Sequence, residues 1–139
     1  RNLTVPAANL SGTLSVAQLA NASNAWTVTP PVTSGTIATT ATSVISNTVS
    51  GFSTYLVTFN ITASMGPTGR AIVASIGVDG TNLTSTNMTQ YIAASTTGCA
   101  SVTYIYTGTT ASHIINGFLW TSGSGGTITN ATLSVVGLA

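Results

Sequence analysis

The sequence predicts an all-β sandwich, a single domain in which antiparallel strands pack in two layers. The first observation is compositional: about a third of the 139 residues are Thr or Ser, and the strong helix formers Glu and Lys are absent. Because Thr, Val and Ile are β-branched, this composition favours strands over helices. The second observation is spacing, since Gly, Pro, Ser and Asn separate the apolar runs about every 8 to 12 residues, as in sandwich and barrel sequences.

The N-terminal segment differs from the rest of the chain. Its small apolar residues follow no regular period, so we expect residues 1–25 to form a stalk, with at most one short helical turn in Ser15–Ala22. From Trp26 the strand pattern begins, and residues 26–139 are expected to form the head domain. A chain of this length buries enough surface for one domain.

Eight strands are expected in the head. In Phe52–Ala63, apolar residues such as Tyr55 and Val57 alternate with polar ones, which indicates a strand with one face in water. Arg70–Val78 is apolar or small on both faces, so we expect a neighbouring subunit to cover its outer face. The predicted strands are Trp26–Thr29, Thr36–Ile45, Phe52–Ala63, Arg70–Val78, Met88–Ala94, Cys99–Thr107, His113–Thr121 and Thr127–Leu138.

Gly, Pro, Ser and Asp residues mark the turns between these strands. If successive strands run antiparallel and the last one ends beside the stalk, the loops alternate between the two ends of the sandwich. The loops expected at the free tip are Ser64–Arg70, Ala94–Cys99 and Thr121–Thr127. The loops expected at the stalk side are Asn47–Gly51, Asp79–Leu83 and Gly108–Ser112.

Charge is almost absent, and this excludes several classes of function. Only 2% of the residues are charged, so the chain has no basic stripe for nucleic acid and no acidic cluster for a hard cation. One Cys and one His do not make a zinc site, and we expect no cofactor; Cys99 is expected to be a small buried hydrophobe. No apolar run reaches the roughly 20 residues of a membrane span, so we expect no membrane insertion.

Enzyme activity is not expected. A Ser-His-Asp mechanism would have to use His113 and Asp79, the only residues of their kinds. Asp79 heads an Asp-Gly turn, His113 begins an apolar strand and no G-x-S-x-G motif is present, so we interpret both residues as structural. Glycoside hydrolysis normally needs two carboxylates, which leaves only a site shared between subunits as a remote alternative.

Several segments carry a resemblance to known families. Val49–Ala63 (VSGFSTYLVTFNITA), Gly117–Trp120 (GFLW) and Ala131–Leu138 (ATLSVVGL) resemble strands of C1q/TNF-like jelly rolls. Val5–Leu19 (VPAANLSGTLSVAQL) resembles the neck repeats that precede head domains in bacteriophage tail fibres. The resemblance implies a homotrimeric jelly-roll head at the tip of a fibre, extracellular and part of the virion. The rest of the fibre would precede residue 1, and the head would attach without covalent bonds to a glycan or protein receptor on the host cell.

A structural alternative stays open. The charge-poor, Thr-rich composition is also similar to the C1q-like C-terminal domains of collagen-like spore-surface glycoproteins. Such a domain would trimerise and terminate a fibre without binding a ligand. No Gly-X-Y collagen register is visible upstream of the head.

The predicted binding site lies at the free tip and suits a neutral ligand. Sugars are recognised by aromatic faces together with hydroxyl and amide hydrogen bonds, and they need no charge. The residues expected to bind the ligand are Arg70, Trp120, Ser122, Ser124, Thr96 and Thr68. Tyr91, Tyr104, Tyr106 and Trp26 are further aromatic candidates, each of which is expected more often in the core or in a subunit interface.

Overall fold

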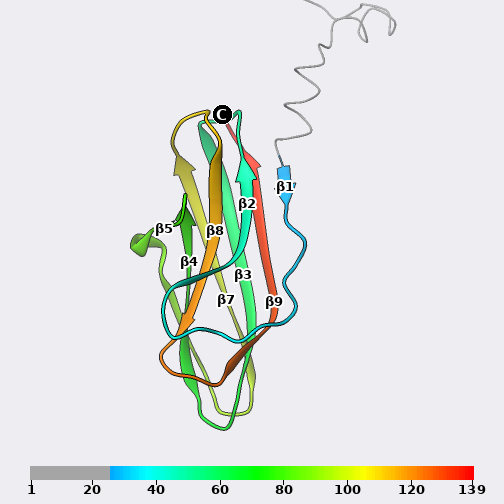
Figure 1. Cartoon of the computed structure of the whole chain (residues 1–139), viewed down its shortest axis with the longest axis vertical. Coiled ribbons are helices and arrows are strands. Elements are labelled where there is room, and N and C mark those ends of the chain that lie inside the picture. Colours follow the sequence, from blue (N-terminus) through cyan, green and yellow to red (C-terminus); the bar gives the residue numbers. More distant parts are fainter. Residues whose placement is uncertain (1–25) are drawn as a thin grey trace, which may run out of the picture.

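The protein folds as a sandwich of two antiparallel sheets, which confirms the all-β prediction (Figure 1). The computed structural model describes residues 26–139. Sheet A contains, in spatial order, β1 (Trp26–Val28), β9 (Gly126–Gly137), β3 (Thr54–Met65) and β7 (Thr97–Thr107). Sheet B contains β2 (Thr42–Val49), β8 (His113–Thr121) and β4 (Arg70–Val78), and β4 also pairs with β5 (Thr81–Asn82) and β6 (Met88–Ile92). This strand order is that of a jelly roll, in which Greek-key connections cross between two packed sheets.

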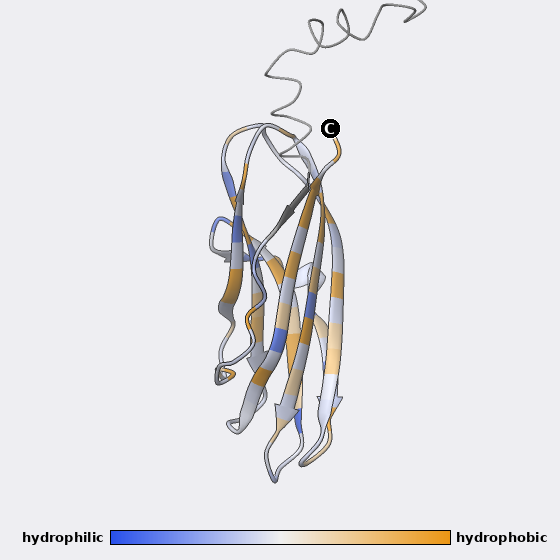
Figure 2. Cartoon of the chain, turned by 90° about the vertical axis from the view of Figure 1, so that its right-hand side faces the viewer, coloured by the Kyte–Doolittle hydropathy of each residue, from blue (hydrophilic) through white to orange (hydrophobic). Residues whose placement is uncertain are grey.

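The core lies between the sheets and follows the alternation that the sequence predicts. Strand β3 pairs along its whole length with β7 on one side and β9 on the other. Its inward side chains Tyr55, Val57 and Phe59 are buried, as are Ile72 and Leu119 from sheet B. Figure 2 shows the resulting bands of hydrophobic and hydrophilic residues along the strands.

One glycine sets the distance between the sheets near the middle of the core. Gly117 on β8 faces inward, and a Cβ atom there would lie 2.6 Å from the ring of Phe59 and 2.8 Å from the side chain of Ile45. Real Cβ atoms do not approach other heavy atoms so closely. The Phe59 ring therefore occupies the volume that a side chain at position 117 would need.

Most predicted strands match the observed ones within two residues at each end, and Arg70–Val78 and His113–Thr121 match β4 and β8 fully. The prediction Thr36–Ile45 is wrong, because the strand in that region is β2, Thr42–Val49. Residues 29–41 instead follow the edge of sheet A, where Val32 forms an isolated bridge to Ala131 before the chain crosses to sheet B. Two prolines and a glycine in this stretch prevent a continuous ladder.

Part of the outer face of β4 is covered within one chain, and the neighbouring subunit expected from the sequence stays a prediction for the half-buried Ala71 and Val73. Ser75 is fully buried, and its hydroxyl donates a hydrogen bond to Oδ1 of Asn82 at 2.5 Å. The ring of Phe118 covers Gly77, where a Cβ atom would overlap it. The loop after β4 and the neighbouring strand β8 therefore bury this part of the outer face within one chain.

The structure also tests what the sequence predicts for Cys99 and for helical segments. Cys99 is exposed, not buried. The inward positions of β7 are Ala100 and Val102, and Cys99 lies on the alternate, outward face of the strand. Within residues 26–139 the helical structure is one 3₁₀ turn, Thr84–Thr86, and no helix there is long and apolar enough to cross a membrane. The predicted stalk 1–25 and the turn in Ser15–Ala22 lie outside the described residues.

The close contact at Gly117 predicts a strong effect of one added methyl group. We expect Gly117→Ala to lower the free energy of unfolding by about 1–3 kcal/mol, because the ring of Phe59 has to move. Denaturant titration followed by circular dichroism measures this. The matched control is Thr103→Ala on the exposed face of β7, which should change stability by less than about 0.5 kcal/mol. Equal stability of Gly117→Ala and the natural protein would show that the sheets can separate there without cost.

Candidate functional site

Three loops gather at one end of the sandwich, which we call the distal end. They connect β3 to β4, β6 to β7 and β8 to β9, and they lie opposite the C-terminus (Figure 1). Backbone hydrogen bonds join them: Met65 N–H donates to Thr96 O at 2.9 Å, Gly66 N–H to Gly125 O at 3.0 Å, and Ser95 N–H to Gly66 O at 2.7 Å. The predicted grouping of these loops is confirmed, and the bonds make them one connected surface.

The opposite, proximal end holds the C-terminal residue and the start of β1 (Figure 1). Ala139 O accepts hydrogen bonds from the N–H groups of Ser53 and Thr54, and Gly51 N–H donates to Thr110 O at 3.1 Å. The loops predicted for the stalk side are therefore found together here. The described chain enters and leaves the sandwich at the end away from the distal loops.

Arg70, Ser122 and Ser124 lie together at the distal end, as the sequence predicts. Nε of Arg70 lies 3.5 Å from the carbonyl oxygen of Ser124, and its guanidinium rests against Gly123, where a Cβ atom would be 2.8 Å from Cζ. Ser122 N–H donates to Ala71 O at 3.0 Å, and the Ser122 hydroxyl accepts from Ala71 N–H at 3.2 Å. These contacts hold the β8–β9 loop against the start of β4.

The remaining predicted site residues are spread more widely. Thr96 is exposed in the β6–β7 loop, and its hydroxyl donates to Ala93 O at 2.9 Å within the turn. Thr68 is exposed in the β3–β4 loop. Trp120 lies near the distal end but not on the loops: it is half-buried on the outer face of sheet B, opposite Val73 of β4.

Tyr91 is not among the six residues expected to bind the ligand, yet it is the most exposed aromatic residue whose side chain the structure describes. Its side chain is 64% exposed, and it lies on β6 opposite Ala71. Tyr104 and Tyr106 are half-buried against the core, while the side chain of Trp26 lies outside what the structure describes. The sequence signal for Tyr91 was weak, because its exposure depends on which face of a short edge strand points outward.

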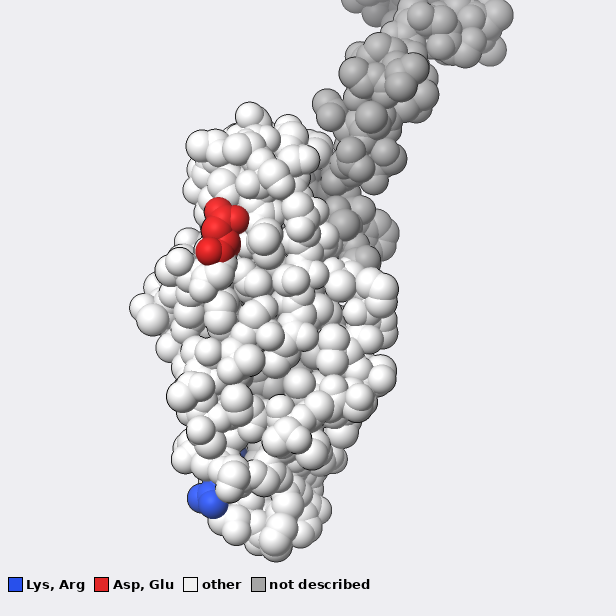
Figure 3. Space-filling view, in the orientation of Figure 1, with Lys and Arg blue, Asp and Glu red and all other residues white. Residues whose placement is uncertain are grey.

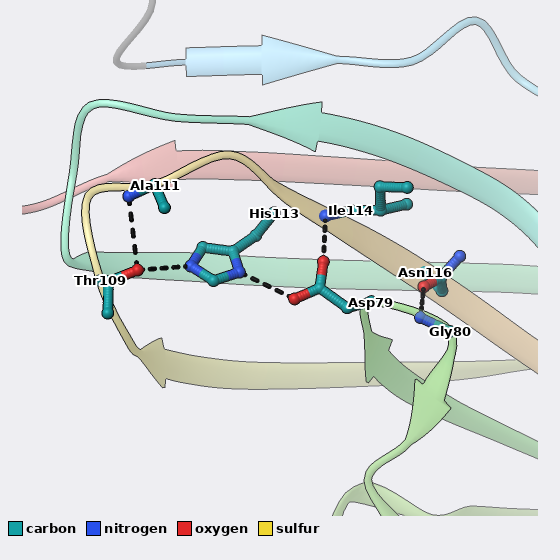
Figure 4. A network of polar contacts seen from close by, with 7 residues as sticks. All are labelled: Asp79, Gly80, Thr109, Ala111, His113, Ile114 and Asn116. Atoms are coloured by element: carbon teal, nitrogen blue, oxygen red, sulfur yellow. Dashed lines mark hydrogen bonds and ion pairs between the residues drawn. The ribbon is translucent and has the colours of Figure 1, made fainter.

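A polar network at the proximal end joins Asp79 to His113 (Figure 4). Asp79 occupies the first position of the β4–β5 turn with a positive φ of 51°. One of its carboxylate oxygens lies 2.9 Å from Nδ1 of His113, and the other accepts from Ile114 N–H at 2.8 Å. Nε2 of His113 lies 3.1 Å from the hydroxyl of Thr109, and its ring packs edge-on against Tyr106 at 5.5 Å.

The network has the connectivity of a hydroxyl-imidazole-carboxylate triad but not its surroundings. A triad carboxylate is buried, whereas the side chain of Asp79 is 52% exposed. The Thr109 hydroxyl is also approached by Ala111 N–H at 3.4 Å inside its own turn. The arrangement instead ties the β4–β5 turn to β8 and to the loop before β8, which is a structural task.

The same contacts set the ionisation of Asp79. The hydrogen bond from His113, and then the one from Ile114 N–H, lower the pKa of this carboxyl below its ordinary value of 3.8, because both favour the charged form. Within residues 26–139, no three His, Cys, Asp or Glu side chains lie close enough together to hold a metal ion. The expectation that the protein needs no cofactor stays a prediction.

Strand order and loop placement together define the class of protein as a jelly-roll sandwich whose loops form one connected end. A chain in the structure of infectious bursal disease virus, Gx strain, is similar, with a TM-score of 0.48 and 14% sequence identity over 79% of the present chain. The match covers 31% of that viral chain, so the present protein spans less than a third of its length. No protein-family model matches the sequence, and no curated protein matches it.

The lowered pKa of Asp79 predicts a loss of stability in acid. The carboxylate stabilises the fold fully above its unfolded pKa, and this stabilisation is lost as the pH falls through the lower pKa of the folded state. We expect Asp79→Asn, which tolerates the same turn conformation, to be less stable than the natural protein at neutral pH. The difference between the two melting temperatures should shrink below about pH 4. A constant difference across this range would show that the ionised carboxylate contributes nothing.

Proposed function

We propose that this protein is the receptor-binding head of a viral tail fibre, and that it attaches through its distal end to a glycan on the host cell surface. The observation that carries the proposal is the separation of the two ends. The first and last described residues lie at the proximal end. The distal loops lie at the other end, where backbone hydrogen bonds join them to one another. A surface held at the far end of an elongated domain is well placed to meet a receptor.

The ligand is expected to be neutral, because the distal end offers hydroxyl groups and almost no charge. Arg70 and Asp79 are the formally charged side chains in residues 26–139, and Figure 3 shows them as single patches near opposite ends of the molecule. Ser122, Ser124 and Thr68 are exposed around Arg70. Hydroxyl groups both donate and accept hydrogen bonds, as the hydroxyls of a sugar do.

Three such heads in a homotrimer would bind a cell surface with avidity, since each adds a site without any new contact. The outer face of sheet A offers a surface for this assembly. Leu56 of β3 lies directly opposite Ile105 of β7 and Val136 of β9, and Ile105 is 58% exposed. Leu56 and Val136 are half-buried, so Ile105 is the exposed member of an apolar row across three strands, and such a row can serve as an interaction surface.

The attachment proposal is tested by binding the full chain to a panel of intact bacterial cells, with polysaccharide from the bound strain as competitor. We expect Arg70→Ala and Ser122→Ala to weaken binding about tenfold or more while both variants keep the circular dichroism spectrum of the natural protein. Thr110→Ala, in an exposed loop of the proximal end, is the matched control and should bind normally. A folded protein that binds no cells would favour the structural head of a surface fibre, and sugar release from the cells would indicate an enzyme.

The trimer is tested by light scattering on the full chain. We expect a mass of three times 13.9 kDa. Ile105→Asp should give monomers that keep the circular dichroism spectrum of the natural protein, because the side chain is exposed within one chain. Met88→Asp, with 47% exposure on sheet B, is the control and should remain trimeric. A monomeric natural protein would contradict the trimeric head.

A further inference from the structure

We propose that the glycan chain lies across the outer face of sheet B beside the distal loops, where Tyr91 and Trp120 form two stacking platforms for sugar rings. This inference rests on the proposed function and makes it more specific. It moves the centre of binding from the distal loops to the face formed by β6, β4 and β8. We call this face the aromatic face, and its residues are Tyr91, Ala71, Val73 and Trp120.

Strand register places both rings on the same side of the sheet. Ile72 and Ala74 of β4 are fully buried, so the alternating residues Ala71 and Val73 point outward. Tyr91 is paired with Ala71, on one side of β4. Trp120 is paired with Val73, on the other side of β4. Because directly opposite residues share a face, the two aromatic residues flank β4 on its outer side.

The spacing of the two rings suits a chain of sugars. Tyr91 and Trp120 are separated by two strand spacings across the sheet and by two residues along it, which gives about 12 Å between their Cα atoms. The small, half-buried side chains of Ala71 and Val73 lie between them. Two ring platforms with a low floor between them can contact an oligosaccharide along its length, which a single platform cannot.

One end of the Tyr91 ring lies against the β3–β4 loop. Its hydroxyl end lies over Gly69 in the β3–β4 loop, where an added Cβ atom would overlap it and would lie 2.8 Å from Cζ of the ring. The rest of the ring stays open to water, since the side chain is 64% exposed. The contact with Gly69 limits how far the ring can turn toward the loop, so the ring loses less freedom on binding than an unsupported one, which favours affinity.

The polar groups around the aromatic face match neutral sugars. Thr89 lies opposite Val73 and is exposed, and the Ser122 hydroxyl, which accepts from Ala71 N–H, keeps its own proton to donate. Nε of Arg70 is directed at Ser124 O in the loop. Apolar ring faces with hydroxyls at their edges complement sugar rings, and β6 and β8 carry no Lys, Arg, Asp or Glu, so these two strands offer no formal cation to an acidic polymer.

The test applies the full chain to an array of immobilised neutral and acidic oligosaccharides and then measures affinity for the best neutral ligand by calorimetry. We expect Tyr91→Ala to weaken this affinity about tenfold or more, while Tyr91→Phe stays close to the natural protein because it keeps the ring. Gly69→Ala should also weaken binding, since it displaces Tyr91 without removing it. Met88→Ala, exposed on the same strand without an aromatic ring, is the matched control and should bind normally.

The outcomes separate this inference from the proposed function. If Tyr91→Ala binds neutral glycans normally while Arg70→Ala does not, the aromatic face is the wrong surface and the distal-loop attachment stands. If the protein binds cells but no neutral glycan on the array, the aromatic face is overturned and a protein or acidic receptor takes its place. If it binds neither cells nor glycans, the proposed function fails together with the inference.

Discussion

The contact between Phe59 and Gly117 fixes how closely the two sheets approach, and the positions of the other elements follow from it. Phe59 belongs to β3, the strand that pairs with neighbours on both sides in sheet A, and Gly117 belongs to β8, which pairs on both sides in sheet B. An interior strand of each sheet therefore takes part in this one close contact. Once these strands are in place, their neighbours are set by hydrogen-bond register, and the loops fall at the two ends of the sandwich.

A second constraint is the near absence of charge. The one Asp and the one His contact each other at the proximal end, where they tie a turn to β8. The rest of the described surface depends on hydroxyl and amide groups for its hydration. These groups titrate outside the physiological range, so the distal end presents the same chemistry over a wide range of pH and ionic strength. This suits recognition through hydrogen bonds and ring stacking better than recognition through ion pairs.

The features that could be predicted from sequence are those set by local periodicity. The alternation in Phe52–Ala63 and the turn at Asp79-Gly80 identified β3 and the end of β4, because both signals lie within a few residues. The path of residues 29–41 could not be predicted, since it depends on bonds to β9 that lie far away in sequence. The same holds for the site: Arg70, Ser122 and Ser124 were grouped by loop counting, but the pairing of Asp79 with His113 and the exposure of Tyr91 depend on register between distant strands.

The placement of β1 beside β9 also determines how the domain would carry a mechanical load. A pull between the residues before β1 and a ligand held at the distal end would act along the strands, because β1 runs antiparallel to β9 from the proximal end. The hydrogen bonds between the strands would then be loaded in shear, all together, and not opened one after another. Shear of this kind resists force better than unzipping, so a domain with this topology would stay folded under a load applied between its two ends.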